Sequence, residues 1–557
     1  MFRAWKLVPL FVLMAWVVAG CGPSGTPLGT QPATEPTSVS NGQSPTAVPK
    51  PENTPVSATQ EDTLVYVSDI SDLITLDPAM AFEPSSYAFT QATYETLLQF
   101  EGADLSSVVP GLAETWSIKD AGAKWEVTFI LRADAKFASG DPVTADDVVY
   151  SVQRLIGLNG TPANLLTVNA QLGADSVSAI DPTTVLFVLP KTVSPQSFLS
   201  IVASTNPQIV DSTLVKAHEV GGDYGSAWLQ DKSAGSGPYQ IGHWTKDTEV
   251  LLVANPNYAG QKPALTNVLV KHVPEAVNRQ TMLEKGDADI ARNLSPEQIA
   301  ALQGVPGVKT VTGSGLILAY VGMNTAVKPL DNAKVREALR YAIDYDGIVN
   351  DLLSGNATKV QGIIPLGLFG ANPNTPFQQD VEKAKTLLQE AGLPNGFSIE
   401  LLTAPVPMPG GTTGPDLAAK LQADWAMINV DVTIKNVAPV EMLGAYRDQK
   451  HQMVLIYWGP EFPDPDANVP HFTDFDLQTL AWRAGWKDPI AAKARDAALL
   501  TDSAQRAAAY MEITDYVMHN GPYIVLYQGG EQFAMRNNVN GFIWNPLGWE
   551  EISTISK

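Results

Sequence analysis

The residues with the clearest chemical potential lie in one short segment that begins at Tyr457 and Trp458 and continues with acidic residues and prolines. These two aromatic residues follow an apolar run, 453–456, that is typical of a buried strand, so we expect them where a strand opens into a loop. Aromatic faces at such a place can pack against a bound molecule, although Trp458 would serve equally well as a core residue. Asp464 and Asp466 alternate with prolines, which is typical of a capped and stiffened turn.

Residues for covalent or metal chemistry are sparse. The six histidines show no HExxH pattern or other ligand spacing, and the single cysteine, Cys21, excludes a CxxC motif. The Gly-Ser-Gly at 235–237 lacks the sequence context of a nucleophile elbow or of a phosphate-binding loop. We therefore expect a protein that is not an enzyme and that uses no metal and no cofactor.

The N-terminus has the layout of a secretory signal. Basic residues precede an apolar run, 7–18, that is shorter than the roughly 20 residues of a membrane span. The small residues before Cys21 resemble a bacterial lipoprotein box, in which the cysteine is lipidated and becomes the new N-terminus; Val18 stands where such boxes more often carry Leu. We expect a signal peptide at 1–20 and a lipidated Cys21, with an uncleaved membrane anchor as the alternative.

The rest of the chain should be an acidic globular protein on a flexible leader. Residues 21–60 consist largely of Pro, Thr, Ser, Gly and Gln and bury too little apolar surface to fold, so we expect a disordered tether. The formal net charge of −22 disfavours binding to nucleic acid or anionic membrane surfaces, which needs clustered Lys and Arg. A chain of 557 residues with 45% apolar content is too long for one core and should form two or three packed units.

Strand and helix patterns alternate along the folded part without a fixed repeat, which indicates an α/β fold. Alternating apolar residues or short apolar runs predict strands at 124–131, 184–189 and 249–253. Helical patterns begin after Thr144 and after Asp331, two residues suited to cap a helix, and a third pattern occupies 380–391.

Short motifs follow one another in order over nearly the whole folded part. They comprise Leu76-Asp77-Pro78-Ala79, Tyr94-Glu95-Thr96-Leu97-Leu98, Pro110-Gly111-Leu112-Ala113-Glu114-Thr115-Trp116, Gly235-Ser236-Gly237-Pro238-Tyr239 and the segments 125–132, 139–148, 286–289, 323–324, 335–339, 342–344 and 458–466. Any one of them is weak, but the ordered set resembles family 5 of the extracellular solute-binding proteins, the dipeptide- and oligopeptide-binding group of ABC importers.

This resemblance implies an α/β fold of the two-lobed periplasmic-binding-protein kind (type II, cluster C), with a hinge and a subdomain inserted in the first lobe. The chain would cross between the lobes twice. The parts expected in this chain are lobe I at 61–99, 181–321 and 521–557, the inserted subdomain at 100–180, and lobe II at 322–520.

The resemblance also implies a place for the ligand. In peptide-binding members, an Asp three residues after a Trp meets the amino group of the ligand, and the matching residue after Trp458 is Glu461, which keeps the charge on a longer arm. We expect Glu461 to bind an ammonium; for a ligand without an amine it would accept sugar hydroxyls or a guanidinium, and a surface carboxylate without a role is the remaining alternative.

Further candidates complete the expected site. Lining residues are expected at Tyr457, Trp458, Gly459, Phe82, Tyr87, Met323 and Asn324. Arg483 is the candidate for a ligand carboxylate, with a solvated salt bridge as the alternative.

The expected function is that of an extracytoplasmic substrate-binding lipoprotein of an ABC transporter. As a monomer anchored to the outer face of the cell membrane or held in the periplasm, it would capture short peptides between its lobes and deliver them to a permease. ATPase subunits would supply the energy, since the chain has no Walker motif. The alternatives are a non-peptide cargo, such as an oligosaccharide or a nickel chelate, and more remotely a secreted hydrolase or a sensor lipoprotein.

Overall fold

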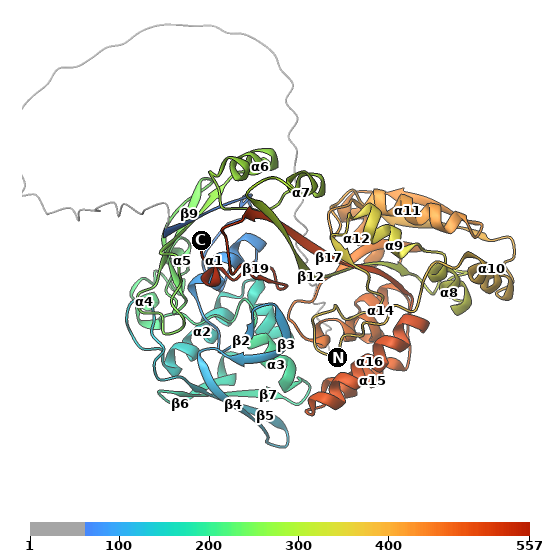
Figure 1. Cartoon of the computed structure of the whole chain (residues 1–557). Coiled ribbons are helices and arrows are strands. Elements are labelled where there is room, and N and C mark those ends of the chain that lie inside the picture. Colours follow the sequence, from blue (N-terminus) through green and yellow to red (C-terminus); the bar gives the residue numbers. More distant parts are fainter. Residues whose placement is uncertain (1–61) are drawn as a thin grey trace, which may run out of the picture. The chain divides into compact units, whose positions relative to one another are not determined.

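The computed structural model describes residues 62–557, and the predicted signal peptide, Cys21 and the tether lie outside the described residues. Its largest sheet contains β1 Thr63–Ser68, β8 Tyr239–Thr245, β9 Glu249–Ala254, β10 Asn267–His272, β11 Ile290–Ala291, β12 Val308–Met323, β13 Ala357–Thr358, β14 Phe397–Thr403, β15 Val430–Asn436, β16 Met453–Trp458 and β17 Tyr523–Arg536. The order is β15-β14-β16-β12-β17-β11-β1-β10-β9-β8, with β13 beside β17 (Figure 1). The predicted strand at 249–253 is confirmed as β9.

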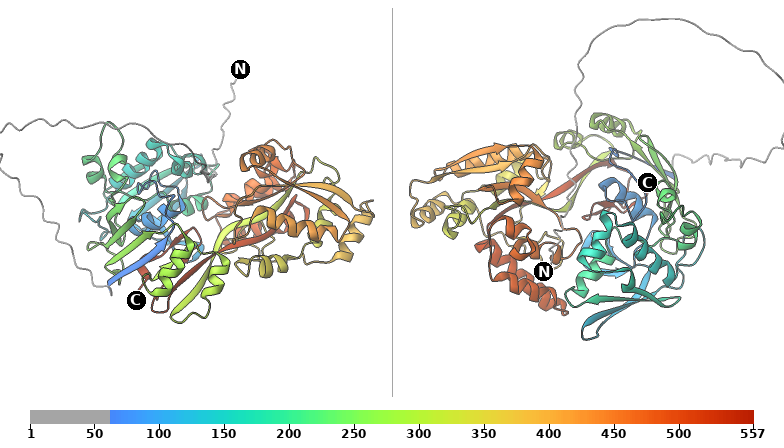
Figure 2. Two further views of the ribbon diagram at one scale, coloured as in Figure 1. Left: turned by 90° about the horizontal axis from the view of Figure 1, so that it is seen from above. Right: turned by 180° about the vertical axis from the view of Figure 1, so that it is seen from behind.

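The long strands β12 and β17 run through both halves of this sheet (Figures 1 and 2). The first half of β12 pairs with the end of β17 beside β11, whereas its second half pairs with the start of β17 and with β16. A register shift between Ser314 and Leu318 separates the two halves. We propose that the chain crosses between its lobes at this shift and opposite it near Gly529, within about ten residues of the expected boundaries at 321 and 520.

A separate antiparallel sheet lies in the expected inserted subdomain. Its strands are β4 Ala113–Asp120, β5 Lys124–Leu131, β6 Val177–Asp181 and β7 Thr184–Pro190, in the order β4-β5-β7-β6. The strands predicted at 124–131 and 184–189 are confirmed. Because β6 pairs with β7 and β7 with β5, the sheet continues past the expected boundary at residue 180, and we propose that the subdomain extends at least through β7.

The helices comprise α1 Pro84–Thr93, α2 Ala145–Leu158, α3 Pro195–Val202, α4 Ser212–Ala217, α5 Ser226–Leu229, α6 Ala276–Lys285, α7 Pro296–Leu302, α8 Ala333–Tyr341, α9 Tyr345–Gly347, α10 Val381–Glu390, α11 Gly414–Ala426, α12 Pro439–Arg447, α13 Val469–Thr473, α14 Leu480–Arg483, α15 Ile490–Ala498 and α16 Ser503–Asn520. Asp380 caps α10 as the pattern predicts, since its carboxylate accepts from the Lys383 N–H at 2.9 Å. The cap of α8 is Asn332, one residue after the predicted Asp331.

Helix α2 shows how the early motifs hold the fold together. Thr144, the predicted cap, forms a capping box with Asp147, a feature that contributes about 1 kcal/mol to helix stability. Farther along the helix, Arg154 donates to both carboxylate oxygens of Asp77 at 2.7 Å, and both side chains are buried. This bidentate pair fixes α2 to the loop before α1.

Candidate ligand-binding site

The end of β16 forms one wall of the candidate site. Antiparallel pairing with β12 sets Tyr457 opposite Ala319 and Trp458 opposite Leu318, so the two rings face opposite sides of the sheet. Tyr457 is 37% exposed, whereas Trp458 is 8% exposed and lies 4.9 Å from the His471 ring, measured between ring centroids. Tyr457 therefore presents an open aromatic face, and Trp458 is mainly a packed residue behind the loop.

Glu461, in the loop after β16, is exposed and contacts an element distant in the chain. Asn169, at the end of the short helix η3 (Leu165–Asn169), donates its side-chain amide to Glu461 Oε2 at 3.1 Å. Burial raises the pKa of Tyr87, and the charges of Glu83 and then Glu461 raise it further, so Tyr87 on α1 lies within electrostatic reach of Glu461. The structure thus joins Glu461 to Asn169, which no sequence signal singled out, and places Tyr87 within electrostatic reach of Glu461.

Two other predicted lining residues are exposed or partly exposed. Phe82 precedes α1 and is 42% exposed. Gly459 follows Trp458 where a Cβ atom would lie 3.2 Å from Ile317 Cγ1, so a side chain at this position would crowd the neighbouring strand β12. Their role as ligand contacts stays a prediction.

The structure places Met323 and Asn324 in the core rather than at an open surface. Met323 is fully buried at the end of β12, opposite Met453. Asn324 is 2% exposed, and its amide donates to the backbone carbonyls of Gln449 and His451 at 3.0 and 3.1 Å. Both side chains stabilise the junction between β12 and β16, which differs from the lining role expected from sequence.

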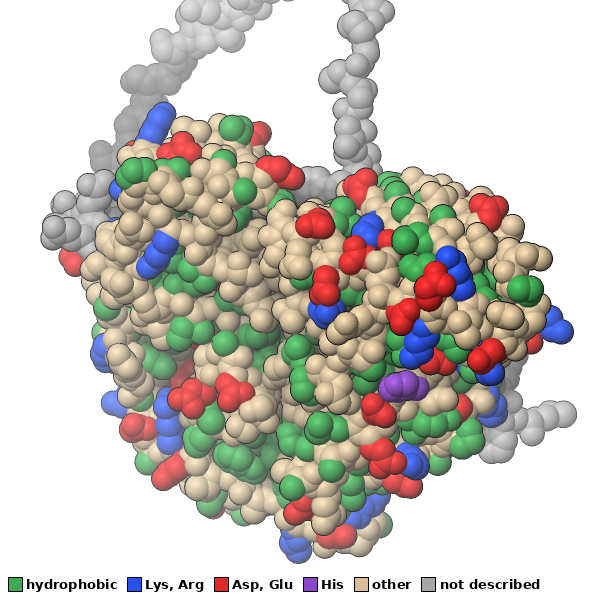
Figure 3. Space-filling view, turned by 45° about the vertical axis from the view of Figure 1, so that its right-hand side comes forward, with side chains coloured by type: hydrophobic (Ala, Val, Ile, Leu, Met, Phe, Trp, Pro, Cys, Tyr) green, Lys and Arg blue, Asp and Glu red, His purple; other side chains and the backbone are tan. Residues whose placement is uncertain are grey.

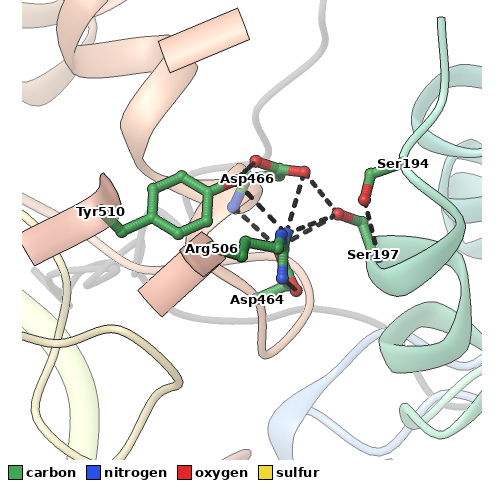
Figure 4. A network of polar contacts seen from close by, with 6 residues as sticks. All are labelled: Ser194, Ser197, Asp464, Asp466, Arg506 and Tyr510. Carbon is green, nitrogen blue, oxygen red and sulfur yellow. Dashed lines mark hydrogen bonds and ion pairs between the residues drawn. The ribbon is translucent and has the colours of Figure 1, made fainter. Parts of the chain in front are cut away.

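A buried polar network joins α3, the loop after β16, and α16 (Figure 4). Arg506 donates to Asp464 at 2.6 and 2.9 Å and to Asp466 at 3.3 Å. The Ser197 hydroxyl lies 3.1 Å from Asp464 Oδ1 and also contacts Asp466, which in turn accepts from the Tyr510 hydroxyl. Burial and the charge of Asp464 raise the pKa of Asp466, and the Arg506 charge opposes this rise. The network therefore links a helix beside the four-stranded sheet to elements next to Glu461.

Asp464 also has the capping role predicted for it. Its carboxylate accepts from the Asp466 N–H at 3.0 Å and caps the short helix η6 (Pro465–Ala467). A cavity of about 220 Å³ lies beside the network, with Phe100, Trp116 and Leu199 on one side and Phe369 and Arg506 on the other. Side chains therefore do not completely fill the space around Phe100, Trp116, Leu199, Phe369 and Arg506.

The described residues offer little else of chemical note. Within residues 62–557, no group of three or more His, Cys, Asp or Glu side chains is arranged to hold a metal ion. No helix in this part of the chain is long and apolar enough to cross a membrane. On the face shown in Figure 3, acidic and basic side chains are interspersed rather than gathered by sign.

The two-lobed α/β fold is that of the solute-binding proteins. Residues 107–476 match the bacterial extracellular solute-binding proteins, family 5 (middle), and the chain belongs to this family. The family and the fold class predicted from the motifs are thereby confirmed. The members of this family are substrate-binding components of ABC transporters, not enzymes.

Individual relatives span nearly the full length of the chain. The probable D,D-dipeptide-binding periplasmic protein DdpA of Escherichia coli (strain K12) is 30% identical over 521 residues, which cover 90% of this chain and 95% of the relative. Heme-binding protein A of Haemophilus influenzae is 27% identical over 550 residues, covering 92% and 96%. The structure of HbpA2 from Haemophilus parasuis superposes with a TM-score of 0.79 at 28% identity, covering 89% of this chain and 99% of that one.

Proposed function

We propose that this protein captures short peptides between its two lobes and delivers them to the permease of an ABC importer. One observation carries the peptide assignment: Glu461 is exposed, accepts a hydrogen bond from the neutral Asn169, and forms no ion pair with any residue of 62–557. The name of the relative DdpA, a dipeptide-binding protein, supports the same cargo.

The physical argument concerns the ammonium of the cargo. Moving an ammonium out of water is costly unless it meets an opposite charge or several hydrogen bonds. Glu461 has no counter-ion among residues 62–557, so an ammonium of the cargo can pair with it, and Tyr87 lies within electrostatic reach of the same carboxylate. A peptide with a free N-terminus satisfies this site, whereas an N-acetylated peptide does not.

The test compares Glu461→Gln with wild type by isothermal titration against dipeptides, tripeptides and their N-acetylated forms. We expect the substitution to weaken the binding of peptides with a free N-terminus by about 2 kcal/mol or more. This is the usual loss when one partner of a buried charge pair is removed. Glu441→Gln, which changes an exposed acidic residue on α12, is the matched control and should leave affinity unchanged. Equal affinity for free and N-acetylated peptides would contradict the role of Glu461.

A non-peptide cargo is the second candidate, because heme-binding protein A is a relative of similar coverage. Oligosaccharides and nickel chelates belong to the same alternative. Native mass spectrometry of gently purified protein identifies a retained ligand directly. If no peptide of the panel binds and a non-peptide molecule co-purifies, the peptide assignment is wrong and the transporter role remains.

We also propose that Cys21 is lipidated after cleavage of 1–20, and that the protein acts as a monomer on the outer side of the cell membrane beside its permease and ATPase subunits. The lone cysteine behind a signal-like segment supports this. Metabolic labelling with a fatty acid should mark the wild-type chain and not Cys21→Ser, and the variant should leave the membrane fraction. Continued labelling of Cys21→Ser would overturn the proposal.

A further inference from the structure

The buried arginines of this protein differ in what compensates their charge. Arg483, the candidate for a ligand carboxylate, is 7% exposed and lies over the Tyr446 ring, 5.2 Å from its centroid, and its role at the ligand stays a prediction. Arg506 on α16 is 3% exposed and contacts two carboxyl groups, those of Asp464 and Asp466. With both carboxyl groups ionised, this second cluster would bury a negative charge that has no counter-ion within it.

The two carboxyl groups share the guanidinium of Arg506 unequally. Asp464 accepts from both terminal nitrogens, at 2.9 and 2.6 Å, and from the backbone N–H of Asp466 at 3.0 Å. Asp466 has a single guanidinium contact, at 3.3 Å. Because bidentate pairing with a guanidinium favours the ionised form of a carboxyl group, Asp464 is the ionised member and Asp466 is the member that can hold a proton.

The contacts around Asp466 need more protons than the neighbouring hydroxyl groups supply (Figure 4). The Ser197 hydroxyl contacts Asp464 Oδ1 at 3.1 Å and also Asp466 Oδ2. The Tyr510 hydroxyl contacts Asp466 Oδ1. These are three contacts between oxygen atoms, whereas the two hydroxyl groups carry two protons. A proton on Asp466 completes the set, because Asp466 then donates to Ser197 and Ser197 donates to Asp464.

The surroundings of Asp466 also favour its neutral form. Burial and then the charge of Asp464 raise the pKa of Asp466, and the Arg506 charge opposes this rise. The groups that face Asp466 are Asp464 in the same loop, Arg506 and Tyr510 on α16, and Ser197 on α3. The Asp466 side chain is 13% exposed, so its proton can exchange with solvent while the fold stays intact.

We propose that docking of α3 onto the loop after β16 takes up one proton at Asp466, so that this contact strengthens in acid and weakens as pH rises. Helix α3 belongs to the part of the chain expected in lobe I, whereas this loop and α16 belong to the part expected in lobe II. When α3 moves away, Asp466 gains water and loses Ser197, which returns its pKa toward the ordinary value of about 4. Between that value and the raised pKa, undocking releases a proton and becomes up to about tenfold more favourable for each pH unit.

The experiment measures the protection of the α3 amides against hydrogen exchange in the full protein without cargo, between pH 4.5 and pH 7.5, corrected for the intrinsic exchange rate. In wild type, this protection should fall by about tenfold or more over the range. Asp466→Asn supplies a neutral amide that donates to Ser197 and accepts from Tyr510, so it should keep the protection high at every pH. Asp488→Asn is the matched control and should keep the wild-type slope, because Asp488 also accepts from a tyrosine hydroxyl, that of Tyr516, at an exposed position.

A second variant covers the case in which Asp466→Asn does not fold. Ser197→Ala removes the acceptor of the shared proton, so the fall in α3 protection with pH should be flatter than in wild type. The proposal is wrong if either variant keeps the wild-type slope. It is also wrong if Asp466→Asn leaves α3 unprotected at every pH, the result expected of a contact that needs an ionised Asp466. Since no cargo is present, these outcomes do not depend on whether the protein binds peptides.

Discussion

Single buried charges in this protein are stable where a specific partner is present. Asp77 illustrates this, because its carboxylate accepts hydrogen bonds from both terminal nitrogens of Arg154. It also accepts hydrogen bonds from the Ser226 hydroxyl at 2.6 Å and from the Ala79 N–H at 3.0 Å. The pair joins the loop before α1 to α2 and to α5. A residue of this kind contributes to the unfolding free energy mainly through what its loss would leave unpaired.

Asp77→Ala should lower the free energy of unfolding by about 3–5 kcal/mol, the loss expected when one partner of a buried ion pair is removed. Urea unfolding followed by far-ultraviolet circular dichroism measures it. Asp231→Ala, which removes an exposed partner of Lys232, is the control and should change stability by less than about 1 kcal/mol. A loss for Asp77→Ala as small as that of the control would show that Arg154 finds another acceptor.

His451 gives a second prediction at the residue scale, concerning pH. Its side chain is 4% exposed, and burial lowers its pKa to about 4, below the usual value of about 6.5. Between these values the unfolded chain binds a proton that the folded chain does not. The His451 contribution to stability is therefore complete above about pH 6.5 and is lost as pH falls toward 4, by up to about 3 kcal/mol.

Replacement by phenylalanine removes this titration. His451→Phe should therefore show a flatter fall in unfolding free energy than wild type between pH 7 and pH 4.5 in denaturant titrations. His519→Gln, at a half-exposed position on α16, should keep the wild-type slope. Identical slopes for His451→Phe and wild type would mean that His451 takes up its proton at the same pH in the folded and the unfolded chain.

At the scale of elements, α3, η6 and α16 meet through Ser197, Asp464, Asp466 and Arg506 (Figure 4). The carboxylates keep Arg506 as a partner even if α3 moves away, whereas Ser197 contacts them only while α3 is in place. The hydrogen bonds of Ser197 therefore connect α3 to the loop that carries Glu461.

Ser197→Ala should lower the unfolding free energy by about 1–3 kcal/mol, since a buried hydroxyl bonded to charged groups is lost. It should also increase protease cleavage in the loop that carries Glu461, because α3 no longer restrains that loop. Ser200→Ala on the same helix is the matched control, since within residues 62–557 the Ser200 hydroxyl makes no hydrogen bond. Equal protease sensitivity of the two variants would argue against a restraining role for Ser197.

At the scale of the whole molecule, the single sheet through β12 and β17 connects the lobes while the register shift near Ser314 divides it. A ligand that contacts both lobes adds interactions only in the closed arrangement, so it draws the lobes together. The hydrogen bond between Asn169 and Glu461 shows that these two residues can approach each other directly.

Saturating peptide from the binding panel should therefore decrease the radius of gyration measured by small-angle X-ray scattering. Glu461→Gln, at the same peptide concentration and below its own saturation, should show a smaller decrease. Calorimetric binding without any change in the radius of gyration would show that the ligand enters lobes that are already closed.

The sequence by itself determined the family, the α/β class, the strands β5, β7, β9 and β16, and the caps at Thr144 and Asp380. These features depend on residues close together in the chain, because alternation and capping act over a few positions. The place of Glu461 in an exposed loop after β16 also followed from a short motif, and its role at the ligand stays a prediction. Local patterns of this kind state which face of an element is buried, but not which other element covers it.

Tertiary structure alone decided the contacts between distant segments. Asn169 and Glu461 are 292 positions apart, and Ser197 and Asp464 are 267 positions apart. The sequence near Asp464 does not predict its ion pair with Arg506. An arginine on a helix face that is otherwise apolar is nevertheless a usable signal of a buried ion pair. Asn324, expected at the ligand, instead binds two carbonyls of its own lobe. Such outcomes depend on how whole elements pack, because a polar side chain can be buried only where the surrounding fold supplies its partners.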